Sequence, residues 1–272
     1  MPAIATLLPM AALLVVIGGL AGVLAGLLGV GGGIVLVPAF FYAFTYLGYG
    51  GPHLMQVCVA TSLATIIVTS VRSVLAHNRK GAVDWDILRG FAPGIVVGSI
   101  LASFVVAHLR TSTLQIIFGC LALVVACYLG LGRSEWRLGK EMPKGPLRVI
   151  LSPLVGFLSV LMGIGGGSFG VPLMTLFNTP IHRAVATAAG FGVLIAVPSG
   201  ISFLLTAIPD SPPLSIGLVN IPAFLLIIAM TLTTAPVGVK LAHAMDPKPL
   251  RRVFAAFLAV VALNMLRKAS GL

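Results

Sequence analysis

Two stretches of the chain share one pattern: GVLAGLLGVGGGIVLVP at 22–38 and GFLSVLMGIGGGSFGVP at 156–172. Aligned at an offset of 134 residues, they are identical at nine positions, which include the run of three glycines and the closing Val-Pro. Similarity at a fixed offset is the sequence signature of a duplicated unit. These stretches therefore point to a chain made of two related halves.

Two weaker matches follow in the same order in each half. Val59-Ala60-Thr61 matches Val185-Ala186-Thr187, and the segment 114–118 matches 250–254. We therefore predict an internal duplication with three parts: a first repeat at 1–135, a basic loop at 136–148 and a second repeat at 149–272.

Composition indicates the solvent in which these repeats fold. The mean hydropathy is +1.12, 58% of residues are apolar and only 8% are charged. A soluble domain has about a quarter of its residues charged, so a soluble surface of this size is excluded. Lipid tolerates such a sequence when the backbone is helical. We predict an all-α polytopic membrane protein, with the lipid bilayer as its surroundings.

Ten apolar segments can form these helices, since a span needs roughly 20 apolar residues. We expect the helices at about 10–28, 34–48, 57–77, 87–107, 113–131, 149–164, 168–178, 184–206, 216–242 and 249–268. Each half then contains five segments, and its first two segments meet at the glycine run.

The glycine runs must break the helix. A single helix over 10–48 would be ~58 Å long, about twice the ~30 Å hydrocarbon core. Glycine is the residue that lets a backbone turn there. Each pair is therefore predicted to be a helical hairpin that returns to its starting side, either re-entrant or made of two tilted spans.

Charge predicts the orientation. The chain has 17 Lys and Arg against 6 Asp and Glu, and the basic residues lie in short loops, not on one compact face that nucleic acid could use. If both hairpins return to the side of the membrane from which they start, 14 basic residues lie on one side of the membrane. Arg110, Arg267 and Lys268 then lie on the other side. The positive-inside rule places the larger group in the cytoplasm of a bacterial-type cell.

An odd number of segments per half inserts the two halves upside down relative to each other. We therefore predict two inverted repeats, each a glycine-broken hairpin followed by three transmembrane helices. This arrangement is typical of secondary transporters.

A helix that begins inside the membrane presents unpaired N–H groups and the positive end of its dipole. Two such ends that face each other would bind an anion without a buried Arg or Lys. The predicted substrate-binding residues on these runs are Gly31, Gly32, Gly33, Gly165, Gly166, Gly167 and Ser168. The alternative is that the glycines only allow tight packing, which is the better account for Gly18, Gly22 and Gly26 and for Gly94 and Gly98.

Hydroxyl side chains add to the predicted site. Thr61 and Ser62 are expected to line the pathway, and Thr187 matches Thr61 in the second repeat. Thr65 and Thr69 lie on the same helix face as Thr61. The alternative for such residues is a hydrogen bond to a carbonyl of their own helix.

Enzymatic motifs are weak here. The segment 166–170 fits GxSxG, the nucleophile elbow, but its counterpart at 32–36 has no serine and no His or Asp lies deep in a segment. No Walker motif is present, and the three cysteines form no CxxC pair. We therefore expect neither an enzyme nor a cofactor or metal site, although an intramembrane hydrolase remains an alternative.

The motifs GLLGVGGGIVLVP (26–38) and MGIGGGSFGVP (162–172) resemble the paired signatures of the sulfite exporter TauE/SafE family of membrane transporters. VCVATSL (57–63), HNRKGAVDW (77–85) and AVATAAG (184–190) are also similar to that family. The resemblance implies a transporter of the cytoplasmic membrane whose substrate is sulfite or an organosulfonate.

These observations lead to one functional prediction and one main alternative. We expect secondary transport of a small sulfur oxoanion, coupled to an ion that would be a proton or sodium. A passive anion channel is the alternative, because it would use the same facing helix ends.

Overall fold

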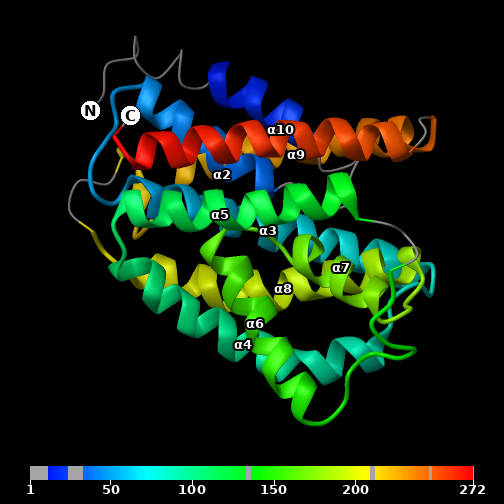
Figure 1. The fold of residues 1–272 in the computed structure, drawn as a ribbon. Helices are drawn as coiled ribbons and strands as arrows, with labels where there is room; N and C mark the ends of the chain where they lie inside the picture. Colours follow the sequence, from blue (N-terminus) through cyan, green and yellow to red (C-terminus); the bar gives the residue numbers. More distant parts are fainter. Residues whose placement is uncertain (1–11, 24–32, 133–135, 209–211, 245–246, 272) are drawn as a thin grey trace.

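The computed structural model describes residues 12–23, 33–132, 136–208, 212–244 and 247–271, and these residues are mostly helical (Figure 1). The predicted all-α membrane fold is confirmed, and each of the ten predicted segments contains a helix. The helices are Ala12–Val23, α2 Gly33–Tyr46, α3 Leu54–Arg79, α4 Trp85–His108, α5 Thr111–Leu131, α6 Pro146–Leu161, α7 Gly167–Leu176, α8 Ile181–Leu205, α9 Ile221–Ala244 and α10 Pro247–Ala269.

The predicted start of the ninth segment is wrong. Instead of a helix from residue 216, Ser215–Ile216 (β1) and Val219–Asn220 (β2) pair as a short antiparallel hairpin. Gly217 lies in its turn with φ +56°, a left-handed conformation that favours glycine. Helix α9 therefore begins only at Ile221.

Among the described residues, five helices are long and apolar enough to cross a membrane: α3, α4, α5, α8 and the Ile221–Gly238 part of α9. Of these, α3 is buried most completely by other helices. Its many hydroxyl side chains therefore face protein, where they find hydrogen-bond partners that lipid cannot supply.

The second hairpin contains a helix too short to cross the membrane. Helix α7 has 10 residues and is therefore about 15 Å long, half of the hydrocarbon thickness. The basic loop before α6 also returns to the end of α7, since Leu138 N–H donates to the Leu176 carbonyl at 2.7 Å. The end of α7 therefore contacts the loop that leads into α6, and a re-entrant course of this hairpin stays a prediction. The tip of the first hairpin falls at 24–32, outside the described residues.

Helices from the two halves pack in matching pairs. Helix α3 packs against α8, and α5 runs beside α10 (Figure 1). Helix α4 contacts α8, and its counterpart α9 contacts α3 in the same way. Helix α2 contacts α3, and its counterpart α7 contacts α8. A duplicated five-helix unit would make these contacts. The opposite insertion of the two halves stays a prediction.

The close contacts of the early glycines confirm that they serve packing. A Cβ on Gly18 would lie 2.9 Å from Met230 Cβ of α9, and one on Gly94 would lie 2.7 Å from Ser152 Cβ of α6. Gly22 and Gly98 meet the same two helices. Gly26 is outside the described residues.

The basic loops gather at one end of the bundle. Figure 1 shows the loop between α3 and α4 and the loop before α6 at one end, with the C-terminal end of α10 at the other. This separation matches the predicted charge distribution. Which end faces the cytoplasm remains a prediction.

Candidate functional site

The tip of the second hairpin, residues 162–166, lies between α3 of the first half and α8 of the second. Ser62 Oγ on α3 donates a hydrogen bond to the Gly163 carbonyl at 2.7 Å. On the other side, a Cβ on Gly166 would lie 2.8 Å from the backbone nitrogen of Gly192 on α8. Glycine at 166 therefore lets the tip backbone contact α8 directly.

Gly163 gives the tip its turn. Its φ is +62°, and a Cβ there would be 3.0 Å from Val59 Cα on α3. A side chain would be strained by the backbone conformation and blocked by α3. The local sequence thus fixes both the shape and the depth of the tip.

The two glycine runs meet at Gly33. This residue begins α2, and a Cβ on it would be 2.9 Å from both the Gly163 carbonyl oxygen and Ile164 Cα. The end of the first run therefore contacts the turn of the second, as the predicted site requires. Gly31 and Gly32 lie outside the described residues, so the geometry concerns Gly33 alone.

Unpaired backbone donors follow the turn. Ile164 N–H donates to the Ser159 carbonyl at 2.9 Å, and Gly170 N–H donates to the Gly166 carbonyl at 2.8 Å. Between them, the N–H groups of 165–169 donate no hydrogen bond within the described part of the chain. Residues 165–168, which include Gly167, are buried. A buried donor that makes no hydrogen bond costs about 1–3 kcal/mol, so this row of donors suits a bound acceptor.

Ser168 adds a side-chain donor to that row. It lies in the first turn of α7 and is 5% exposed, and its Oγ has no hydrogen-bond partner among the described residues. Because no His or carboxylate reaches this oxygen there, the described residues do not supply the base that a serine nucleophile needs. A hydroxyl at a helix N-terminus can instead donate to an anion.

Ser159 and Gln56 also carry buried oxygens without partners in the described chain. Ser159 is three residues from Gly156, which packs against α4, so it lies on the face of α6 that meets that helix. Gln56 donates through Nε2 to the Leu109 carbonyl. Ser168 differs from both because it lies within the row of backbone N–H groups of 165–169 that donate no hydrogen bond in the described part of the chain.

Thr61 and Thr187 occupy matching positions. Thr61 Oγ1 on α3 accepts from Asn220 N–H at 3.0 Å, and Asn220 caps α9 by accepting from Ala223 N–H. Thr187 Oγ1 on α8 accepts from Asp84 N–H at 2.9 Å. We call these two hydrogen bonds the threonine–cap contacts.

Asp84 caps α4 in the way that Asn220 caps α9. Its carboxylate accepts from Ile87 N–H at 3.2 Å, which caps the helix. The same carboxylate forms an ion pair with Arg183 at 3.1 Å, and Arg183 lies one turn before Thr187 on α8. The contact at this end is therefore charged, whereas the Asn220 contact is neutral.

Both threonines also flank the hairpin tip. Thr61 precedes Ser62, which binds Gly163, and Thr187 precedes Ala188, whose carbonyl faces Gly166. Within the described residues neither threonine donates a hydrogen bond, so each keeps a proton to offer. Sequence reasoning placed both residues near the site but did not find their contacts with the helix caps.

The other predicted hydroxyls behave differently. Thr65 donates to the Ser62 carbonyl at 2.6 Å and Thr69 to the Thr65 carbonyl at 3.2 Å, both within α3. The alternative of bonding to their own helix therefore holds for these two residues.

Gly192 was missed by the sequence reasoning, and Ser70, one of the hydroxyl residues of the segment 57–77, was not assigned to the site. A Cβ on Gly192 would lie 3.1 Å from Ser70 Cβ and 3.6 Å from Gly166 N. The two residues thus close the space behind the tip. The small residues that follow Ala184 on α8 were the available signal, because such residues mark close helix approach in membranes.

Comparison with known proteins agrees with this architecture. The family model described as "Sulfite exporter TauE/SafE" matches residues 14–265. The chain belongs to the TauE/SafE family. It is therefore a membrane transporter protein by family, as the sequence motifs indicated. No solved structure matches the TauE/SafE chain.

Two relatives show how far the similarity extends. A "Probable membrane transporter protein" of Haemophilus influenzae is 32% identical over 238 residues, which is 87% of this chain and 90% of the relative. A "Probable membrane transporter protein" of Methanocaldococcus jannaschii is 29% identical, covering 86% and 87% of the two chains. The similarity therefore spans nearly the full length of each protein.

Proposed function

We propose that this TauE/SafE protein is a secondary transporter of a small sulfur oxoanion such as sulfite or an organosulfonate. The anion binds at the N-terminus of α7, against the start of α2. The observation that carries the proposal is the buried Ser168 hydroxyl, which has no partner in the described chain and lies beside a row of unpaired N–H groups.

This arrangement favours an oxoanion on physical grounds. Several N–H donors and the positive helix end stabilise negative charge, and the neighbouring side chains described above are uncharged. An anion with three oxygens can accept from several of these donors at once. Because Lys and Arg are not part of this set, the anion is held without a strong ion pair and can also be released.

The position of the tip supports transport through alternating access. The tip touches α3 of the first half through Ser62 and α8 of the second half through Gly166. Movement of one half relative to the other would then expose the same site to each side in turn. We expect the coupling ion to be a proton or sodium and the protein to act in the cytoplasmic membrane.

Transport in proteoliposomes tests the proposal. Sulfite, thiosulfate, sulfate, a sulfonate and a carboxylate are offered to wild type and to Ser168→Ala. We expect uphill uptake of a sulfur oxoanion driven by a proton or sodium gradient, with an affinity ~10–100-fold weaker in the variant, since a hydrogen bond to a charged group is worth about 1.5–3 kcal/mol.

The matched control is Ser199→Ala. Ser199 is also buried in a membrane helix, but its hydroxyl donates to the Ile195 carbonyl of its own helix. The control should transport normally. Equal affinities in wild type and Ser168→Ala would contradict the site, whereas purely downhill flux would identify a channel. Labelling of Ser168 by a serine-reactive probe would favour a hydrolase.

A further inference from the structure

The basic loop between the two halves is attached to the end of α7. Leu138 N–H and Gly139 N–H both donate to the Leu176 carbonyl, at 2.7 and 3.4 Å. A Cβ on Gly139 would be 2.8 Å from the ring of Phe177, so glycine allows the loop to lie against that ring. The loop therefore has a defined position on the hairpin.

A cavity of about 400 Å³ lies at this attachment, and it is lined by Arg137, Leu138, Gly139, Lys140 and Asn178. Arg137 Nε donates to Asn178 Oδ1 at 3.3 Å, which orients the guanidinium. Within the described residues, Lys140 makes no ion pair. The cavity thus brings two cations to one concave surface.

We propose that this cavity binds the phosphodiester headgroup of an anionic phospholipid. Its height in the membrane is the first reason. Helix α5 ends at Leu131 and α8 begins at Ile181, so residues 137–140 and 178 lie just beyond the ends of two candidate spans. Lipid phosphates occupy the same level, directly outside the hydrocarbon core.

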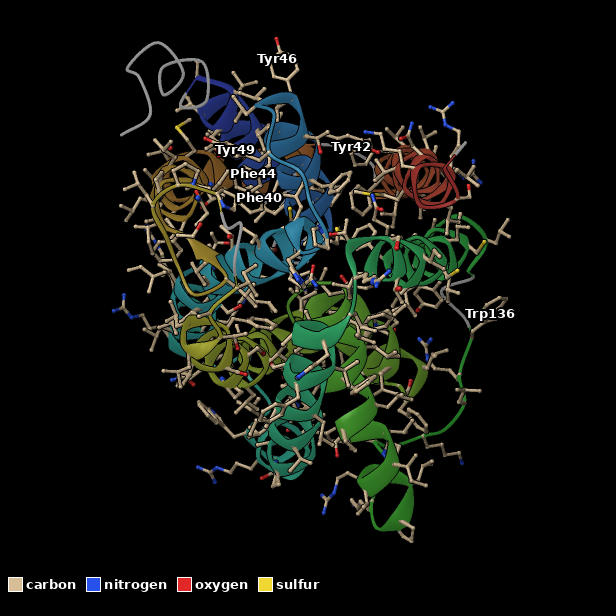
Figure 2. The ribbon with its side chains drawn as sticks, turned by 90° about the vertical axis from the view of Figure 1, so that its left-hand side faces the viewer. Phe40, Tyr42, Phe44, Tyr46, Tyr49 and Trp136 are labelled. Atoms are coloured by element: carbon tan, nitrogen blue, oxygen red, sulfur yellow. The ribbon has the colours of Figure 1, made fainter. Side chains whose placement is uncertain are left out.

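The exposed apolar residues around the cavity are the second reason. Trp136 is 50% exposed and projects from the edge of the molecule in Figure 2. Leu138 is 73% exposed. Tryptophan is enriched at the membrane interface, where its ring lies among the headgroups. A soluble oxoanion would make no use of these two side chains, whereas a lipid would cover them with its glycerol and upper acyl chains.

Local charge is the third reason. Among the described residues of the loop, Glu141 follows Lys140 but forms its ion pair with Lys144, at 3.3 Å. Basic side chains next to membrane spans attract anionic lipids by about 1 kcal/mol each. Two cations together with an apolar rim therefore select an anionic lipid over a zwitterionic one.

The bound lipid would hold the loop, and through it the end of α7, at the membrane surface. This proposal uses no residue of the hairpin tip. It can therefore be tested by binding alone, whether or not the proposed transport function is correct.

Thermal unfolding of the purified full-length protein in a neutral detergent tests lipid binding. Phosphatidylglycerol, phosphatidylcholine or inorganic phosphate is added to separate samples. We expect phosphatidylglycerol to raise the unfolding midpoint by ~2 °C or more, as a ligand that binds only the folded state does. Phosphatidylcholine and inorganic phosphate should leave the midpoint unchanged.

Single-charge variants identify the binding site. Arg137→Gln and Lys140→Gln should each lose most of the phosphatidylglycerol shift, while Lys80→Gln, which removes the same charge from the exposed end of α3, should keep it. Midpoints without lipid show that each variant folds. An undiminished shift in Arg137→Gln and Lys140→Gln overturns the proposal, as does an equal shift caused by inorganic phosphate.

Discussion

Neighbouring glycines of the second glycine run have different surroundings. A Cβ on Gly166 would meet Phe191, the Ala188 carbonyl and Gly192 N, whereas the nearest atom to a Cβ on Gly165 is Ile66 Cγ2 at 3.3 Å. Gly166 therefore serves packing, while among the described residues a Cβ on Gly165 would meet only one tight contact, with Ile66. Site and packing are thus not exclusive alternatives for this run.

The difference predicts unequal effects for two neighbouring substitutions. Gly166→Ala should lower the free energy of unfolding by ~1–3 kcal/mol, because the added methyl group is forced into the backbone of α8. Gly165→Ala should lose less stability than Gly166→Ala, since Ile66 Cγ2 needs to shift by only a few tenths of an ångström and no backbone atom blocks the methyl group. Unfolding midpoints in detergent measure both. A similar loss in the two variants would show that the tip has no free space at Gly165.

At the scale of the elements, the threonine–cap contacts join helices from opposite halves. Thr61 on α3 holds the start of α9, and Thr187 on α8 holds the start of α4. The two contacts have the same chemistry and reciprocal connectivity. They account physically for the repeated Val-Ala-Thr pattern, which hydrophobicity alone does not require.

Removal of either threonine oxygen should weaken this link. Thr61→Val and Thr187→Val keep the shape of the side chain but leave a buried backbone N–H unpaired, at a cost of about 1–3 kcal/mol. We expect lower unfolding midpoints in both variants. Thr65→Val is the control, because Thr65 is equally buried but donates only to a carbonyl of its own helix. If the control loses as much stability, the contacts have no special importance.

At the scale of the whole molecule, the distribution of basic residues predicts how the protein is oriented in the membrane. The loop between α3 and α4 and the loop before α6 lie at the same end of the bundle (Figure 1). The positive-inside rule places that end in the cytoplasm. The segment around Asp210, which has no Lys or Arg nearby, should then face the outside.

Accessibility of single cysteines tests this orientation. Cys58, Cys120 and Cys127 are replaced by alanine, and Lys140→Cys or Asp210→Cys is introduced. An impermeant thiol reagent applied to intact cells should label position 210 and not position 140, because the membrane shields the cytoplasmic side. Labelling of position 140 from outside would exclude the inverted arrangement.

Much of the fold was predictable because the sequence patterns that indicate it are short and local. Apolar length and the glycine breaks located all ten helices, and the repeated motifs indicated both the duplication and the family. The start of α9 was missed because an apolar run has the same hydropathy as a short hairpin, and only the turn at Gly217 separates them.

The sequence by itself determined that this is a membrane protein, that one glycine-rich motif occurs twice, and that Thr61 and Thr187 occupy matching positions in the two halves. Those properties follow from composition and short-range pattern. Only the tertiary structure decided that the loop before α6 contacts the end of α7, that Gly33 meets Gly163, and that Thr61 and Thr187 bind the cap residues of helices of the opposite half. These contacts join residues far apart along the chain, and their partners are selected by packing and by the need to satisfy buried polar groups, which no single segment reveals.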